Sequence, residues 1–96
     1  MHDDRFEWDD DKARANLAKH KVSFRDAKLV FDTGNVNDDP DLSMNYGEDR
    51  YIAVGLVKGR LMAVLYTLRG ERRRIISARL ATRKEEQDYA KKFRPG

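Results

Sequence analysis

The chain has 96 residues, of which 40% are hydrophobic and 39% charged, and it contains no cysteine. A chain of this length buries a modest core, so we expect one domain that spans residues 1–96. The lack of cysteine excludes a disulfide framework and a thiolate zinc site. The first residues lack the parts of a signal peptide, and no apolar run approaches the length that spans a bilayer. We therefore expect a cytoplasmic protein with no membrane partner.

The N-terminal third predicts a short strand followed by two helices. Residues 5–8 alternate polar and apolar side chains, as a strand does. Aspartates at 9–11 and basic residues at 19–21 suit the two ends of a first helix over about residues 10–19. A capping-box pattern at residues 23–26 begins a second helix, which we expect to end near Gly34. Its predicted core face comprises Phe24, Ala27, Val30 and Phe31.

The second half of the chain changes to a period of two, which is typical of strands. Residues 51–57, 61–67 and 73–80 predict three strands, joined by tight turns at Lys58-Gly59 and Arg69-Gly70. Residues 38–41 predict a loop, because proline cannot donate a hydrogen bond to a strand neighbour. A second capping box at residues 82–85 begins a final helix, with Tyr89 and Phe93 on its buried side.

These elements predict an α+β fold. A short N-terminal strand and two helices pack on an antiparallel sheet of three to four strands, and a C-terminal helix follows. Because the helices cover one face of the sheet, its other face stays open. Alternation along the third long strand places Ile76, Ala78 and Leu80 on the drier face. Ser77 and Arg79 then point to the opposite face, where a ligand can sit.

Charge is unevenly distributed along the chain. Residues 69–96 contain ten Lys and Arg against four Asp and Glu, although the whole chain carries a net charge of +3. Residues 1–11 contain six acids and one base, and residues 32–49 contain six acids and no base. Such segregation also occurs on the solvated surface of small domains without any function. The functional interpretation is a basic face that attracts a polyanion such as RNA by counterion release.

The order of several short motifs resembles the BrnT-type toxins of bacterial toxin–antitoxin pairs. The motifs extend over nearly the whole chain, and their order is specific although no single motif is. They are Phe6-Glu7-Trp8-Asp9, Lys12, Asn16 and Lys19-His20; Val22-Ser23-Phe24, Ala27 and Val30-Phe31-Asp32; Glu48-Asp49-Arg50-Tyr51 and Gly55; and Arg69-Gly70, Arg74-Ile75-Ile76-Ser77-Ala78-Arg79, Ala81-Thr82, Glu85 and Tyr89.

The resemblance implies a RelE-like fold and a ribonuclease toxin that needs no metal or other cofactor and inhibits translation. It also implies a cognate ribbon-helix-helix antitoxin, BrnA-like, which covers the toxin and binds the operator DNA of the pair. The toxin would then meet DNA only through its antitoxin. One departure is Lys21, where the family commonly has a glycine, which supplies a left-handed helix end at low cost.

RNA cleaves itself when its 2′-hydroxyl is aligned with the neighbouring phosphate, so a protein has only to position, stabilise charge and move protons. Arg79 is the first candidate for this work, as a phosphate clamp, because a guanidinium is a planar fork that stays charged. The alternative is an arginine that pairs with a carboxylate of the sheet or a helix. His20 is the candidate general acid or base, but it lies where a packing histidine is at least as common.

The remaining candidates each have a structural alternative. Lys19 is a second phosphate contact or a charge that complements the helix dipole. Glu48 and Arg50 complete the candidate catalytic set, although two such residues on one strand face also pair simply to hold a sheet edge. Glu85 is explained by the capping box, and a role as a general base is its functional alternative. The candidate RNA-binding residues are Arg69, Arg72, Arg73, Arg74, Arg83 and Lys84, with Tyr51 or Tyr66 as a stacking platform or as core.

Three functions are compatible with these residues. The first is a toxin endoribonuclease restrained by its antitoxin. The second is an RNA-binding module without catalysis, and the third is a protein-interaction domain whose basic tract docks an acidic helix. The acid–base inventory favours the first, because binding alone requires neither His20 nor Glu48.

Overall fold

The computed structural model of the chain describes residues 2–42 and 47–93. Within these residues one sheet forms, with the strand order β1-β5-β4-β3-β2. β1 runs parallel to β5, and the other neighbouring strands are antiparallel. The strands are β1 (Phe6–Glu7), β2 (Asn37–Pro40), β3 (Arg50–Val57), β4 (Arg60–Arg69) and β5 (Arg72–Leu80).

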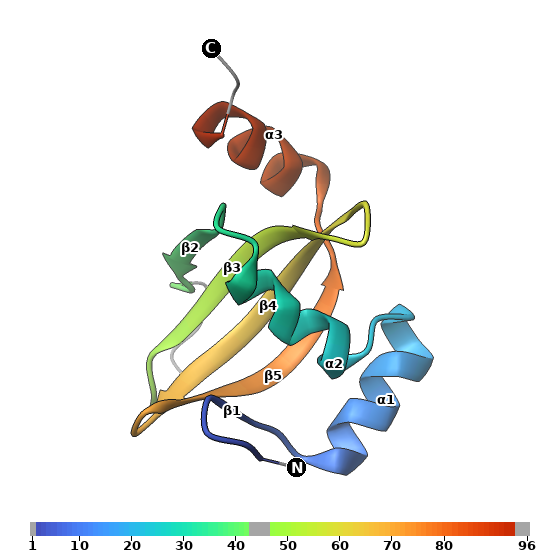
Figure 1. The fold of residues 1–96 in the computed structure, drawn as a ribbon, viewed down its shortest axis with the longest axis vertical. Coiled ribbons are helices and arrows are strands. Elements are labelled where there is room, and N and C mark those ends of the chain that lie inside the picture. Colours follow the sequence, from blue (N-terminus) through green and yellow to red (C-terminus); the bar gives the residue numbers. More distant parts are fainter. Residues whose placement is uncertain (1, 43–46, 94–96) are drawn as a thin grey trace.

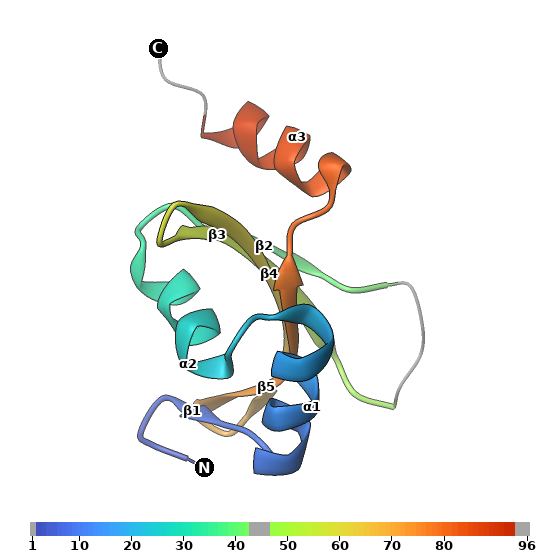
Figure 2. The same cartoon turned by 90° about the vertical axis from the view of Figure 1, so that its right-hand side faces the viewer.

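Helices cover one face of this sheet and leave the other open (Figures 1 and 2). The covering elements are α1 (Asp10–His20), α2 (Phe24–Ala27) and the 3₁₀ helix η1 (Lys28–Asp32). α3 (Arg83–Lys92) lies beyond one end of the sheet, away from α1. The α+β class is therefore confirmed, with an N-terminal strand, two helices, a mostly antiparallel sheet and a C-terminal helix.

The ends of α1 follow the predicted chemistry. The Asp9 carboxylate accepts hydrogen bonds from the backbone N–H groups of Asp11 and Lys12 and so caps the helix. At the other end Lys21 adopts a left-handed conformation, with φ 60° and ψ 26°. This is the position at which the resembled family commonly has glycine, so the backbone conformation is retained without the residue that adopts it most easily. The Lys21 ammonium group donates to the Ala18 carbonyl at 3.0 Å, which partly offsets the strain.

The second helix differs from the prediction beyond Ala27. Ser23 caps α2 as expected, because its hydroxyl accepts from the Asp26 N–H at 3.0 Å. From Lys28 the chain winds as a 3₁₀ helix, in which residues three apart lie above one another. Ala27 and Val30 are three apart, and both are fully buried. Spacings of three and four both occur on an α-helical face, so the pattern alone did not distinguish the two kinds of helix.

The predicted loop at residues 38–41 is wrong, because residues 37–40 form β2. This strand pairs with β3, with Pro40 opposite Tyr51, and makes the sheet five strands wide. Proline is tolerated there because β2 is an edge strand, so the missing N–H faces away from the sheet. Asp38 also anchors β2, since the Tyr66 hydroxyl donates to its carboxylate at 2.6 Å.

A bulge in β5 changes the predicted faces of that strand. Ser77 pairs with Leu65 and Ile75 pairs with Tyr66, so Ile76 has no partner on β4. Ile75 and Ala78 are consequently both buried in the helix-covered core, whereas Leu80 is 46% exposed. The prediction that Ile76, Ala78 and Leu80 form the drier face is therefore wrong. Ser77 and Arg79 nevertheless point to the open face, as expected.

The core lies between the sheet and the covering helices. Phe6 and Trp8 belong to it, and the Trp8 ring contacts Phe24 edge to face with 5.7 Å between centroids. Gly55 allows η1 to approach β3 closely, because a Cβ there would lie 2.9 Å from a methyl carbon of Val30. The expected buried side of α3 is absent. Its Tyr89 and Phe93 rings contact each other at 4.7 Å and are only half-buried.

Asn16 joins α1 to the edge of β5. β1 pairs with β5 only at Arg73 and Arg74, so the same edge lacks a strand partner further along. At Ala78 the buried Asn16 amide takes the place of that strand. It donates to the Ala78 carbonyl at 2.8 Å and accepts from the Ala78 N–H at 3.1 Å. It also donates to the Val22 carbonyl at 2.9 Å, so one side chain fixes the helix, the following loop and the strand.

We predict that Asn16→Ala lowers the free energy of unfolding by about 2–4 kcal/mol, because buried backbone groups lose their partners. Urea denaturation of the purified protein measures this change. The matched control is Lys12→Ala, an exposed side chain of the same helix, for which we expect a change within about 0.5 kcal/mol. An Asn16→Ala variant as stable as the control would show that the amide does not hold α1 on the sheet.

Candidate functional site

A hollow of about 190 Å³ opens on the sheet face opposite α1 and α2. Paired residues of β3, β4 and β5 line it side by side. Leu65 pairs with both Ile52 and Ser77, and Ala63 pairs with Arg79. The small Ala63 side chain leaves space beside the long arginine. The residues that line the hollow are Asp41, Ile52, Ala63, Leu65, Ser77 and Arg79.

Arg79 is held at this hollow by a two-point ion pair with Glu85. Its Nη1 donates to Glu85 Oε1 at 2.6 Å and its Nη2 donates to Oε2 at 3.1 Å. Nη1 also lies 3.4 Å from the Leu80 carbonyl oxygen. The Arg79 and Glu85 side chains are 36% and 20% exposed, so solvent reaches the arginine more than the acid. The alternative in which Arg79 pairs with a carboxylate is therefore present, and the side chain still borders open space.

Glu85 serves α3 and Arg79 at once. Its Oε1 accepts from the Thr82 N–H at 2.9 Å, and its own N–H donates to the Thr82 hydroxyl at 3.2 Å. These two bonds are the predicted capping box at the start of α3. A capping acid is held by backbone geometry and not only by side-chain rotamers. The carboxylate that binds Arg79 is thus itself held at the start of α3.

The pair shifts the pKa of both groups. Burial by itself raises the pKa of Glu85, but the hydrogen bonds from Arg79 and from the Thr82 backbone outweigh it and lower the pKa. The hydrogen bond from Glu85 raises the pKa of Arg79, against a smaller opposite effect of burial. Both groups are therefore charged at neutral pH.

Asp41 enters the hollow although sequence reasoning did not select it. Its N–H donates to the Arg50 carbonyl at 2.7 Å, which extends the β2–β3 pairing by one step beyond Pro40. The sequence predicts a loop at Asp41, and the direction of a loop side chain cannot be predicted from strand alternation. Had the strand been recognised, alternation with Asp39, which pairs with Ile52, would have placed Asp41 on the open side.

Glu48 and Arg50 form an ion pair at the other end of the sheet. Arg50 Nε lies 3.4 Å from Glu48 Oε1, and Arg69 Nη2 lies 3.8 Å from Oε2. This arrangement matches the structural alternative, in which the two residues pair to hold a sheet edge. Arg50 shares its face with Ile52, so it points to the same side as the hollow. Along the strands it is about 13 Å from the row of Arg79, at roughly 3.3 Å per residue.

The arginines that open β5 mostly have partners within the protein. Arg74 Nη1 lies 2.7 Å from the Glu7 carboxylate and ties β1 to β5. Arg72 Nε donates to the Asp3 carbonyl at 2.6 Å. The Arg73 guanidinium lies 4.5 Å from the centre of the Phe31 ring, and its buried Nε has no hydrogen bond within the described residues. Their role in RNA binding stays a prediction.

The other predicted residues lie on helices. Lys19 is exposed and His20 is half-buried at the C-terminal end of α1, and neither lines the hollow that holds Arg79. His20 is one turn beyond Asn16 and shares its face of the helix, so it lies toward β5. Arg83 and Lys84 are exposed in the first turn of α3, next to the Thr82 cap. The structure thus groups Arg79 with Arg83 and Lys84 but not with His20.

Tyr66 packs inside the protein. It is 4% exposed, and its ring stacks on Tyr51 with 5.5 Å between centroids. Burial, together with the hydrogen bond to Asp38, raises the pKa of Tyr66. These contacts support the core alternative for Tyr66 over a stacking platform for a base.

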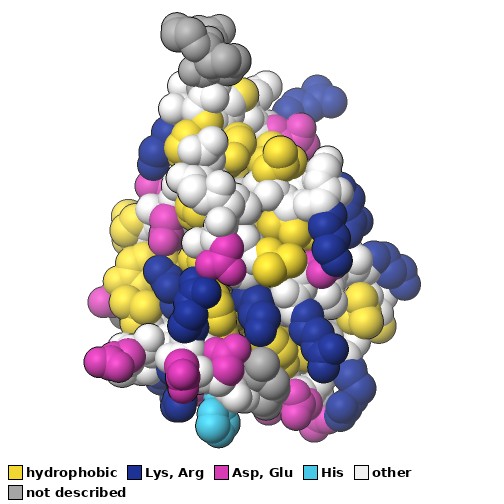
Figure 3. All heavy atoms as spheres, viewed as in Figure 1, with side chains coloured by type: hydrophobic (Ala, Val, Ile, Leu, Met, Phe, Trp, Pro, Cys, Tyr) yellow, Lys and Arg dark blue, Asp and Glu magenta, His cyan; other side chains and the backbone are white. Residues whose placement is uncertain are grey.

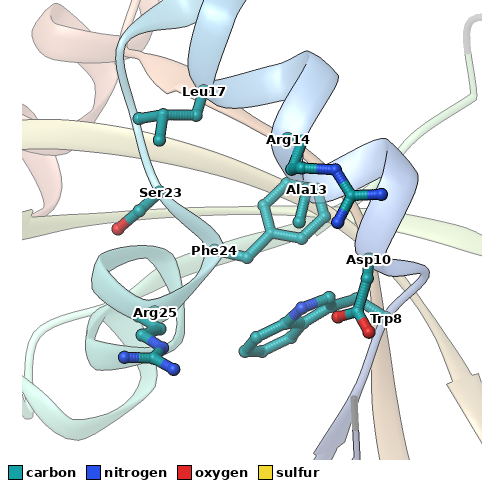
Figure 4. A pocket seen from close by; sticks show the side chains of 8 residues that line it. All are labelled: Trp8, Asp10, Ala13, Arg14, Leu17, Ser23, Phe24 and Arg25. Atoms are coloured by element: carbon teal, nitrogen blue, oxygen red, sulfur yellow. The ribbon is translucent and has the colours of Figure 1, made fainter.

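Basic side chains also gather outside the C-terminal tract. Figure 3 shows the helix-covered face, where Lys and Arg follow the border that α1 forms and mix with acids below it. A second hollow of about 310 Å³ lies between α1 and the start of α2 (Figure 4). Trp8, Ala13, Leu17 and Phe24 make it largely apolar, and none of the predicted catalytic residues lines it. The open-face hollow is therefore the better candidate for phosphate chemistry.

The described residues contain no group of three or more His, Asp or Glu side chains placed to hold a metal ion. None of their helices is long and apolar enough to cross a membrane.

The lowered pKa of Glu85 predicts how stability depends on pH. A carboxyl group whose pKa is lower in the folded state stabilises the fold above its unfolded pKa, and this contribution disappears as the pH falls through the folded value. The wild type should therefore exceed Glu85→Gln in free energy of unfolding at pH 7, and the difference should shrink below the ordinary value of 4.5. Denaturation of both proteins from pH 7 to pH 3 measures it. Glu86→Gln, at an exposed site of the same turn, should show no such trend, and a pH-independent difference for Glu85→Gln would contradict the assignment.

None of the curated proteins compared with the chain matches it. A protein-family model does match, over residues 8–85, and it describes a ribonuclease toxin, BrnT, of a type II toxin–antitoxin system. The match includes α1, the whole sheet beyond β1 and the Arg79–Glu85 pair. The chain therefore belongs to the BrnT family of ribonuclease toxins of type II toxin–antitoxin systems.

Proposed function

We propose that this toxin is a metal-independent endoribonuclease that inhibits translation and that it binds the scissile phosphate of RNA at the open-face hollow. The observation that carries the proposal is the position of Arg79, which lines a hollow beside Ser77 on the sheet face opposite α1 and α2. A fixed cation beside open space is the arrangement that stabilises a developing oxyanion. We further propose that residues 1–96 form a single RelE-like domain.

The proposed reaction uses the RNA itself as the nucleophile. The 2′-oxygen attacks the adjacent phosphorus, the bond from phosphorus to the 5′-oxygen breaks, and a 2′,3′-cyclic phosphate and a 5′-hydroxyl form. A base takes the proton of the 2′-hydroxyl, and an acid gives one to the departing 5′-oxygen. Arg79 stabilises the charge that builds up on the phosphate oxygens. Asp41 lines the same hollow and is one candidate base, with His20 as the candidate from α1.

The path of the RNA follows from the cations on the open side. Arg83 and Lys84 lie beyond Arg79 in the first turn of α3, and Arg50 and Arg69 lie toward the other end of the sheet. Such a row neutralises successive phosphates and supplies affinity without reading sequence. Arg72, Arg73 and Arg74 border the same end of β5 and add positive potential there.

The proposed partner is a cognate antitoxin of the ribbon-helix-helix class, BrnA-like, which would cover the toxin and bring it to operator DNA. Membership of a type II toxin family supports an antitoxin, because such toxins are restrained by a protein. A partner that binds only the folded toxin would also stabilise this small chain by mass action.

We predict that Arg79→Ala lowers the rate of RNA cleavage by about 10²–10³, the usual loss for one donor to a developing oxyanion. Cleavage of a labelled RNA under single-turnover conditions measures the rate, and circular dichroism verifies the fold. The matched control is Arg60→Ala, an exposed arginine that starts β4 and shares the helix-covered side with Met62. Equal rates for Arg79→Ala and the wild type would remove Arg79 from the mechanism.

The same assay tests the nucleophile and the metal. An RNA with a single 2′-deoxy nucleotide at the cut should remain intact, because the attacking oxygen is missing. An excess of chelator should leave the rate unchanged. Inhibition by the chelator, or cleavage of the deoxy substrate, would contradict the proposed reaction, and an absence of any cleavage would favour an RNA-binding module without catalysis.

A further inference from the structure

The hydrogen bonds of Arg79 leave one edge of its guanidinium group unused. The group carries five N–H donors in a rigid fork. Nη1 faces Glu85 Oε1 and the Leu80 carbonyl, and Nη2 gives one hydrogen to Oε2. The Nε–H and the second Nη2 hydrogen remain, and they point along the same edge. Neither has a partner among the residues that the structure describes.

That remaining edge has the geometry of a phosphate site. Two parallel N–H donors on one side of a guanidinium match two oxygens of a phosphate, and such two-point contacts are stronger and more directional than single ones. The edge belongs to a residue that lines the hollow, and the Ser77 hydroxyl borders the same space without a hydrogen bond of its own in the described part of the chain. Together they offer three donors to one tetrahedral anion.

Glu85 decides which edge remains. It binds the guanidinium end-on, so it occupies Nη1 and Nη2 and leaves the Nε side open. The Thr82 N–H also donates to Oε1, so the carboxylate is held by a second hydrogen bond that does not depend on Arg79. Orientation that is fixed before the substrate arrives reduces the entropy lost in the transition state.

We propose that Glu85 is a positioning residue, which fixes the Arg79 guanidinium end-on so that its Nε edge, with the Ser77 hydroxyl, binds the scissile phosphodiester of RNA. The proposal rests on the proposed ribonuclease function and adds the atoms and the residue that orient them. Glu85 touches no substrate in this scheme. Its negative charge weakens the general attraction for RNA while it improves the geometry of the reaction.

The capping box permits an experiment that separates the two roles of Glu85. Glutamine also completes a capping box, so Glu85→Gln keeps the helix start and removes the charged grip on Arg79. Thr82→Ala removes the capping hydroxyl and keeps the Arg79–Glu85 pair. Glu85→Gln therefore tests the orientation of Arg79, and Thr82→Ala tests the capping of α3.

For Glu85→Gln we expect kcat to fall about tenfold, because the guanidinium loses its fixed orientation. KM should stay equal or decrease, because one negative charge near the RNA is removed. Thr82→Ala should retain the wild-type kcat at a temperature where both variants are folded. A kcat of Glu85→Gln equal to or above the wild type would overturn the proposal, and so would an equal loss of kcat in Thr82→Ala.

A binding measurement keeps the proposal testable even if the protein cleaves no RNA. In NMR spectra of protein with ¹⁵N-labelled arginine, inorganic phosphate should shift the Arg79 Nε–H resonance of the wild type. The resonance should be assigned by its loss in Arg79→Lys. The shift should be weaker in Glu85→Gln at the same phosphate concentration. No shift in the wild type, or an undiminished shift in Glu85→Gln, would contradict the positioning role whatever the outcome for ribonuclease activity.

Discussion

The arrangement of the protein depends on one side-chain amide at the edge of β5. Asn16 satisfies both backbone groups of Ala78 where no strand continues, and the next residue along β5 is Arg79. Without this contact the N–H and carbonyl groups of Ala78, at the buried edge of β5, would have no hydrogen-bond partner. The amide also holds the residue that follows α1, through Val22. The helix layer and the candidate site are therefore fixed to the same two residues of one strand.

The two faces of the sheet have separate tasks. The covered face carries the core and also holds one charged group, since Arg73 lies over the Phe31 ring. Arg74 alternates with Ile75 and pairs with Glu7 on the other face. The open face keeps Arg79 at a hollow. The bulge at Ile76 allows this division, because it lets Ile75 and Ala78 both enter the core while Ser77 and Arg79 remain on the open side. A continuous basic tract in the sequence is thus split into structural arginines and arginines available to a ligand.

Local signals predicted most of the elements. The caps of α1 and α3, the hairpin turn at Lys58-Gly59 and the period of the long strands are all set by residues near one another in sequence, and these predictions are confirmed. β2 was missed because its pairing depends on a distant strand and on being at an edge, where Pro40 is harmless. The bulge at Ile76 depends on register with β4, which no local pattern specifies.

The candidate site was predictable to a similar degree. Arg79 was selected from its strand position, and its face was predicted correctly although the neighbouring core residues were not. Its pairing with Glu85 was one of two alternatives that the sequence left open. Asp41 was missed because it follows the strand that was taken for a loop. Asp41 and Ser77 line one hollow from distant parts of the chain, and no local sequence pattern indicates that they share it.

RNA that lies on the open face of the sheet should perturb the residues of that face. The most direct test is to add a short 2′-O-methyl RNA, which lacks the attacking hydroxyl, to ¹⁵N-labelled protein and to map the amide resonances that change. We expect the changes to concentrate at Ile52, Ser77 and Arg79, with few at Leu17 and Phe24 in the hollow between α1 and α2. Changes confined to the α1–α2 side, with the open face unaffected, would contradict it.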